Sequence, residues 1–154
     1  MGAVYFYHLT ESAPEEALPL LVDRARAAGW RVLVRAGDDA LLDRLDTALW
    51  QGPPEAFPAH GRSGGPHDAA QPVLLGRGEA AEFDCVMALD GAPLVPEEVE
   101  ALARACVIFD GRDGAAVQAA RGQWKTLTGA GLSAQYWAQE DGRWVKKAES
   151  GGEG

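Results

Sequence analysis

The sequence contains only two cysteines, Cys85 and Cys106, which are too few for a disulfide scaffold or a zinc motif. No apolar run approaches the roughly 18 residues that a membrane span needs. The N-terminus has no basic residue ahead of an apolar stretch, so it does not resemble a secretory signal. The three histidines show neither HxxxH nor HExxH spacing, and we expect no metal and no cofactor. These absences together predict a reduced, cytoplasmic protein.

Positive charge is also scarce, and lysine is absent from residues 1–100. The chain has 14 Lys and Arg against 23 Asp and Glu, a formal net charge of −9. This balance argues against general nucleic-acid binding, which needs a basic surface to neutralise phosphates. Residues 1–100 carry seven Arg against 17 Asp and Glu, whereas residues 101–150 carry seven Lys and Arg against five Asp and Glu, so any local basic patch is expected in the last third of the chain.

The 154 residues, with 47% hydrophobic and 24% charged, fit one ordinary globular domain. We assign residues 1–148 to this domain and expect residues 149–154 to form a disordered tail. The apolar patterns predict helices over residues 14–28, 38–50, 96–103 and 113–129, and strands over 3–9, 31–35, 72–75, 85–89, 106–109, 133–139 and 143–147. Strands that alternate with helices predict an α/β domain with a largely parallel sheet.

Smaller features complete this prediction. Residues 10–12, Thr-Glu-Ser, supply turn and cap chemistry before the first helix, and Asp141-Gly142 is a hairpin signal between the last two strands. Residues 52–71, rich in proline and glycine, are expected to form a long irregular loop.

Three motifs for enzymatic or metal sites have simpler interpretations. Gly61-Arg62-Ser63-Gly64-Gly65 matches the GxSxG elbow of serine hydrolases, but the predicted loop provides neither the strand before Ser63 nor the helix after it. The first strand–helix junction has no glycine, as a GxGxxG or P-loop requires. Residues 110–114 lack the ligands of a calcium loop and are better interpreted as a turn in which Asp113 caps the next helix. An α/β enzyme, either a serine hydrolase or a nucleotide-binding protein, that uses the 52–71 loop stays as the alternative function.

The segment that follows the second predicted helix is aromatic and rich in proline. Trp50 ends that helix, and Phe57 and Pro58 follow in the loop, with His60 close behind. Both rings could pack back onto the core, or they could form a rigid patch for a protein partner, since buried aromatic side chains dominate interface energetics. A homodimer built on the same patch is a third interpretation.

The predicted helix after Asp113 has a second cluster of interest. Its core stripe is expected to contain Val117, Ala120, Trp124 and Leu127. Arg121 and Lys125 lie four residues apart on the adjoining face, and no acid in the later turns relieves their repulsion. They form either a solvated face or an anion clamp, flanked by Trp124 and Val117, that captures a carboxylate and an adjacent apolar side chain.

The order of motifs resembles the chi subunit of bacterial DNA polymerase III holoenzyme along nearly the whole chain. One distinguishing mark is the run from Asp46 to Trp50 with Phe-Pro-x-His about seven residues on, and the other is the helical motif from Ala120 to Lys125. Further similarity lies at residues 5–9, 29–34, 71–73, 109–111 and 136–137.

The resemblance implies a Rossmann-like three-layer α/β fold that serves as a non-catalytic replisome adaptor. Chi proteins link the clamp-loader assembly to single-stranded-DNA-binding protein by holding its acidic C-terminal tail, which ends in a phenylalanine carboxylate. The family's tail site corresponds here to Arg121 and Lys125 beside Trp124, with Val117 at its edge. A small-molecule substrate, direct sequence-specific nucleic-acid binding and a membrane are not implied.

A second family site binds the psi subunit of the clamp loader or a helicase-like repair partner. Its residues correspond here to the aromatic segment with Trp50, Phe57, Pro58 and His60. The sequence departs from the family elsewhere, because Val117 and Gln118 stand where some members have a basic residue. The expected clamp is therefore weaker, and the C-terminal Lys146 and Lys147 could supply the missing charge.

Overall fold

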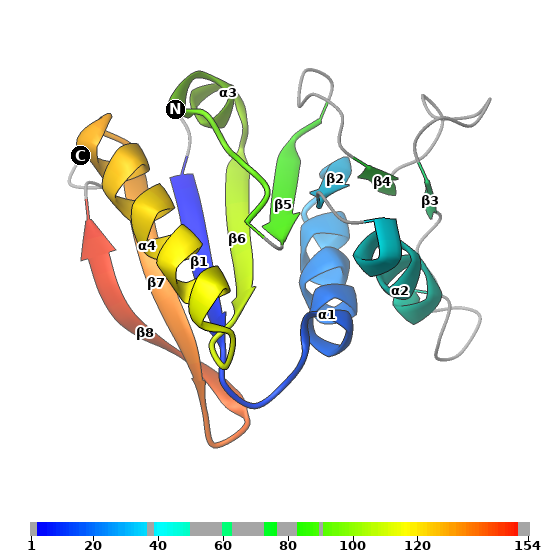
Figure 1. Cartoon of the computed structure of the whole chain (residues 1–154). Coiled ribbons are helices and arrows are strands. Elements are labelled where there is room, and N and C mark those ends of the chain that lie inside the picture. Colours follow the sequence, from blue (N-terminus) through cyan, green and yellow to red (C-terminus); the bar gives the residue numbers. More distant parts are fainter. Residues whose placement is uncertain are drawn as a thin grey trace.

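The computed structural model describes residues 3–36, 39–49, 60–62, 73–76, 83–89 and 91–150. The described strands form one eight-stranded sheet in the order β3-β4-β2-β5-β6-β1-β7-β8. All neighbouring strands are parallel except the hairpin pair β7 and β8 at one edge (Figure 1). The predicted α/β class with a largely parallel sheet is confirmed. The strands are β1 (Ala3–Leu9), β2 (Val32–Arg35), β3 (His60–Arg62), β4 (Val73–Gly76), β5 (Cys85–Leu89), β6 (Arg104–Asp110), β7 (Ser133–Glu140) and β8 (Arg143–Ser150).

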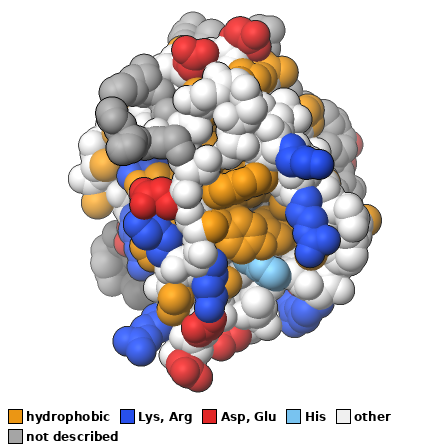
Figure 2. All heavy atoms as spheres, turned by 90° about the vertical axis from the view of Figure 1, so that its left-hand side faces the viewer, with side chains coloured by type: hydrophobic (Ala, Val, Ile, Leu, Met, Phe, Trp, Pro, Cys, Tyr) orange, Lys and Arg blue, Asp and Glu red, His pale blue; other side chains and the backbone are white. Residues whose placement is uncertain are grey.

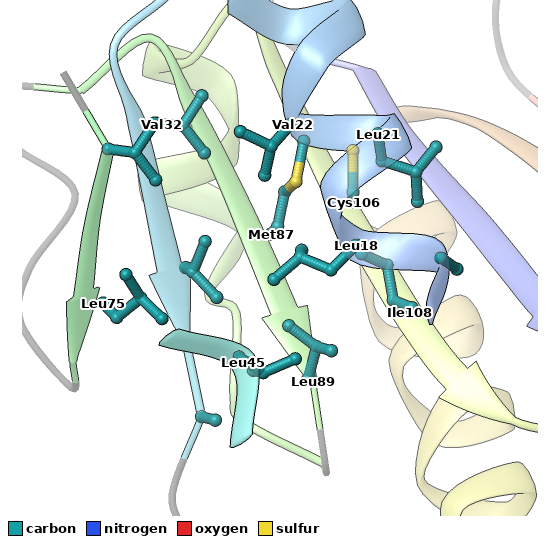
Figure 3. Packing of buried hydrophobic residues seen from close by; sticks show 14 of the residues in the cluster. Leu18, Leu21, Val22, Val32, Leu45, Leu75, Met87, Leu89, Cys106 and Ile108 are labelled. Atoms are coloured by element: carbon teal, nitrogen blue, oxygen red, sulfur yellow. The ribbon is translucent and has the colours of Figure 1, made fainter. Parts of the chain in front are cut away.

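Four helices in the described part of the chain cover both faces of this sheet. They are α1 (Pro14–Ala27), α2 (Asp39–Leu49), α3 (Pro96–Ala101) and α4 (Gly114–Gly129). One buried cluster joins α1 and α2 to the sheet, and Figure 3 shows Leu18 and Val22 of α1 facing Met87 of β5. The other cluster joins α3 and α4 to the opposite face, with Phe6 of β1 at 0% exposure. Strands buried on both faces explain the uniformly apolar runs in the sequence.

The start of α1 differs from the prediction, because no side chain of residues 10–12 caps it. The N-cap is Ala13, and the carboxylate of Glu16 accepts a hydrogen bond from the Ala13 amide at 2.7 Å. The amides of residues 10–12 instead donate to Oε1 of Gln139 on β7, at 2.8–3.1 Å. Gln139 therefore ties the β1–α1 loop to the C-terminal hairpin. The helix ends as expected before Gly29, whose φ of +83° favours glycine.

Two segments that were expected to be irregular contain strand residues. The short strand β3 lies inside the segment 52–71 that was expected to be irregular, and it pairs with β4. At the other end, β8 continues to Ser150, so residues 149 and 150 belong to the sheet and not to a tail. The predicted hairpin turn is confirmed, with positive φ at both Asp141 and Gly142.

A partly buried ion pair connects β2 to α3, with side-chain exposures of 9% for Arg35 and 19% for Glu98. Nη1 and Nη2 of Arg35 donate to the Glu98 carboxylate, at 2.8 and 2.9 Å, and Nη1 also donates to the carbonyl of Pro93. Burial acts to raise the pKa of Glu98, but the hydrogen bonds from Arg35 and from the Val95 amide outweigh it and hold this pKa below its usual value. The bidentate pair fixes the start of α3 against the sheet.

Candidate functional site

Helix α4 positions the two cations singled out from the sequence. Asp113 caps the helix as predicted, since its carboxylate accepts hydrogen bonds from the amides of Ala115 and Ala116. Of the predicted core stripe, Ala120 and Leu127 are buried, whereas Val117 and Trp124 are only half-buried. Val117 and Trp124 therefore lie at the margin of the core, between the buried face of α4 and its solvent-exposed face.

The exposed side of α4 forms one wall of a groove of about 740 Å³. Its lining combines α4 with the last two strands: Gln118, Arg121, Gly122, Trp124 and Lys125 come from the helix, Tyr136 from β7 and Ala148 from β8. Figure 2 shows apolar side chains gathered at the centre of this side of the molecule, with Lys and Arg side chains beside them. The groove can therefore accept a ligand that is both anionic and apolar.

Aromatic rings form the floor of the groove. The rings of Trp124 and Tyr136 meet edge to face with centroids 6.0 Å apart, and Phe6 packs beneath both, at 5.3 Å from Trp124 and 6.4 Å from Tyr136. Such pairs have preferred geometries and contribute beyond the area that they bury. The floor is a rigid apolar surface held by the core under it.

Arg121 and Lys125 are both exposed on the wall of this groove. Among the described residues, no carboxylate forms an ion pair with either of them. Their charges are therefore available to an incoming anion. The two cations suggested as reinforcements are engaged elsewhere, since Lys146 pairs with Glu149 at 3.1 Å and Lys147 pairs with Glu140.

His8 supports the floor, a role that no sequence pattern indicated. Its Nδ1 lies 2.7 Å from the hydroxyl of Tyr136, and its ring packs against Phe109 at 4.9 Å. Burial lowers the pKa of His8, the nearby charge of Arg121 lowers it further, and Asp110 opposes both effects. Burial also raises the pKa of the Tyr136 hydroxyl, so for both groups the surroundings favour the uncharged form.

Because Gly111 has no side chain, the ring of His8 can pack directly against it. A Cβ added to Gly111 would lie 2.0 Å from Nε2 of His8 and 2.9 Å from the carbonyl oxygen of Leu9. The signal in the sequence was the Asp110-Gly111 turn, which indicated only a change of chain direction.

The chain that forms this groove matches the model of one protein family. The model of the family described as DNA polymerase III chi subunit, HolC, matches residues 1–135. The chain belongs to the chi family. The family supplies accessory subunits of DNA polymerase III, which places this chi-family chain in DNA replication in association with other replisome components. A search of curated proteins finds no match.

The second site expected of a chi protein lies almost entirely outside the described residues. Trp50, Phe57 and Pro58 lie outside the described residues, and of His60 only the backbone is described, as the first residue of β3. Ser63 of the GxSxG motif also lies outside them. One argument against that motif was wrong, however, because β3 ends at Arg62, directly before the serine.

The remaining candidate groups have structural roles in this chi-family chain. Cys85 and Cys106 are buried free thiols, as the sequence predicted. In the part of the chain that the structure describes, no cluster of three or more His, Cys, Asp or Glu could hold a metal ion. No helix there is long and apolar enough to cross a membrane.

Proposed function

We propose that this chain is a non-catalytic adaptor that links the clamp-loader and polymerase assembly to single-stranded-DNA-binding protein. Its groove between α4, β7 and β8 would hold that protein's acidic C-terminal tail, in the cytoplasm at the replisome. The observation that carries this proposal is the placement of two exposed cations, Arg121 and Lys125, on the wall above an aromatic floor. Helices on both faces of a mostly parallel sheet support the Rossmann-like three-layer description of the scaffold.

The chemistry of the tail matches the chemistry of the groove. A terminal carboxylate suits bidentate capture by the guanidinium of Arg121, and Lys125 adds a second positive charge one helical turn away. The terminal phenylalanine side chain can then stack on the rings of Trp124 and Tyr136. A protein with a net charge of −9 repels DNA overall, yet this local patch attracts an acidic peptide.

The test is a fluorescence-anisotropy titration with a labelled acidic peptide that ends in phenylalanine with a free carboxylate. We expect saturable binding that weakens as salt rises, because exposed charges are screened. Arg121→Ala is expected to weaken binding at least tenfold, a loss of roughly 1.4 kcal/mol or more. A peptide with an amidated C-terminus should lose affinity for the wild-type protein and lose little more in the variant.

Arg24→Ala is the matched control, since it removes an exposed arginine from α1, which covers the opposite face of the sheet. It should leave the affinity within twofold of the wild-type value. Equal losses in Arg24→Ala and Arg121→Ala would show that only net charge matters and would refute the assigned site. An absence of peptide binding at low salt would refute the proposed function itself.

The same proposal includes a second contact, carried by the family resemblance alone. A psi-like clamp-loader subunit or a helicase-like partner would bind to the aromatic segment, at Trp50, Phe57, Pro58 and His60. Co-purification with the clamp-loader subunits of the same bacterium tests this. The double variant Trp50→Ala with Phe57→Ala should lose the partner and keep the tail peptide, and retention of the partner would remove these residues from the site.

A further inference from the structure

The wall of the groove opposite α4 comes from a part of the chain beyond the segment that the family model matches. That match ends at residue 135, whereas Tyr136 and Ala148 both line the groove. Strand β8 is otherwise polar where it passes this site, with lysines at 146 and 147 and a glutamate at 149. Ala148 is therefore a small apolar side chain within a polar stretch of β8.

A β-bulge places Ala148 there. The register of the hairpin pairs Trp137 with Lys146, but pairs the preceding Tyr136 with Ala148, so Lys147 is the extra residue. If the strand continued without this irregularity, Lys147 would stand opposite Tyr136. Its long stem would then lie beside the aromatic floor and fill part of the groove.

The lysines beside Ala148 are directed to their own partners. Lys147 forms an ion pair with Glu140, and Lys146 forms one with Glu149. Lys146 also stands opposite Trp137, which packs against the core cluster on the α1 face of the sheet. Of the residues of β8, Ala148 lines the groove.

We propose that Ala148 determines the size of the apolar side chain that the groove accepts. The bulge in β8 sets a methyl group where a lysine would stand, and so leaves room beside Tyr136 and Trp124 for an aromatic ring. This inference rests on the proposed function, since it concerns the terminal side chain of an acidic peptide bound by Arg121 and Lys125. The C-terminal hairpin is then part of the binding site and not an appendage to it.

The test measures selectivity with two acidic peptides that differ only in the last residue, phenylalanine or alanine. The wild-type protein should prefer the phenylalanine peptide. Ala148→Trp should reduce this preference at least fivefold while changing the affinity for the alanine peptide less than twofold. Ala148→Leu, with a smaller side chain, should give an intermediate loss. The control is Ala27→Trp at an exposed position on α1, which should leave both affinities unchanged.

The possible results of this experiment distinguish a failure of the role assigned to Ala148 from a failure of the proposed function. Urea unfolding first checks that each variant retains a cooperative transition, and the leucine variant provides the test if the tryptophan variant does not fold. Wild-type binding with an unchanged preference in the Ala148 variants would refute the role of Ala148 and leave the proposed function intact. Failure of the wild-type protein to bind either peptide would refute the function instead.

Discussion

Replacing Gly111 with alanine should disturb His8, which supports the aromatic floor of the groove. The added Cβ would lie 2.0 Å from Nε2 of His8, a separation that no packed structure tolerates, and 2.9 Å from the carbonyl oxygen of Leu9. The ring of His8 must therefore move, and its 2.7 Å hydrogen bond to Tyr136 cannot survive unchanged. Because φ of Gly111 is not in the left-handed region, the cost comes from lost space and not from backbone strain.

The magnitude follows from the contacts that the His8 ring makes. Loss of the hydrogen bond to Tyr136 costs about 1 kcal/mol. Forcing an extra methyl group into the packed region between Gly111, Leu9 and the His8–Phe109 ring pair costs about 1–3 kcal/mol. The expected total is a decrease of about 2–4 kcal/mol in the free energy of unfolding, a large fraction of the stability of an ordinary domain.

Urea unfolding followed by tryptophan fluorescence measures this change. With a typical slope for a small protein, the midpoint should fall by about 1–3 M. Gly114→Ala is the matched control, because a Cβ at that position, in the first turn of α4, meets nothing within 4 Å. It should be neutral or stabilise the protein by up to about 1 kcal/mol.

A double-mutant cycle identifies the cause. In a His8→Ala background the ring is absent, so Gly111→Ala should cost at least about 1 kcal/mol less than in the wild-type background. Strict additivity of the two substitutions would show that the ring of His8 does not limit the space at Gly111. Equal stabilities for Gly111→Ala and Gly114→Ala would refute the whole packing argument.

Three further predictions concern side chains around the sheet. Gln139→Ala removes the acceptor of three loop amides and should lower stability by about 1–3 kcal/mol, with faster hydrogen exchange at those amides as the direct readout. The pKa of Glu98 is lowered in the folded protein, so the pairing of Glu98 with Arg35 stabilises the fold at pH values above the ordinary pKa of 4.5. This stabilisation is lost as the pH falls through the lower pKa of the folded state. The Glu98→Gln variant should be less stable than the wild-type protein at neutral pH, and its stability should depend less on pH in this acidic range. Tyr136→Phe keeps the ring but removes the hydrogen bond to His8, and should cost about 1 kcal/mol in urea unfolding while preserving the preference for a phenylalanine-ended peptide.

The strand and helix order was predictable because local patterns carry it. Runs such as residues 32–34 and Cys85–Leu89 are apolar throughout, and the structure buries them on both faces of a parallel sheet. The short strand β3 escaped prediction because His-Gly-Arg has no apolar pattern, and only pairing with β4 makes it a strand. The cap of α1 was assigned to the wrong residues because Gln139, far away in the sequence, bonds their side chains: the Thr10 hydroxyl donates to the Gln139 carbonyl, and the Gln139 side-chain amide donates to the Ser12 hydroxyl.

The cations of the site were also predictable, because Arg121 and Lys125 share one helix face and helical spacing is a local property. The rest of the groove depends on which strands meet. Tyr136 reaches Trp124 because β7 lies beside β1, and Ala148 reaches Tyr136 only through a bulge that no local pattern announces. Sequence reasoning therefore identified one wall of the groove and could not identify the other.

The central position of β1 has a consequence for how the chain folds. The strand nearest the N-terminus pairs on one side with β6 and on the other with β7, so Phe6 lies between Val107 and Tyr136 in the sheet. Neither pairing can form until β6, which begins at Arg104, has left the ribosome. Closing such long loops is slow, since the entropy of the intervening chain is lost before the contacts form. During synthesis β1 therefore stays unpaired, with its apolar side chains exposed, until β6 and β7 follow. In that state it is a target for chaperones that bind extended hydrophobic segments.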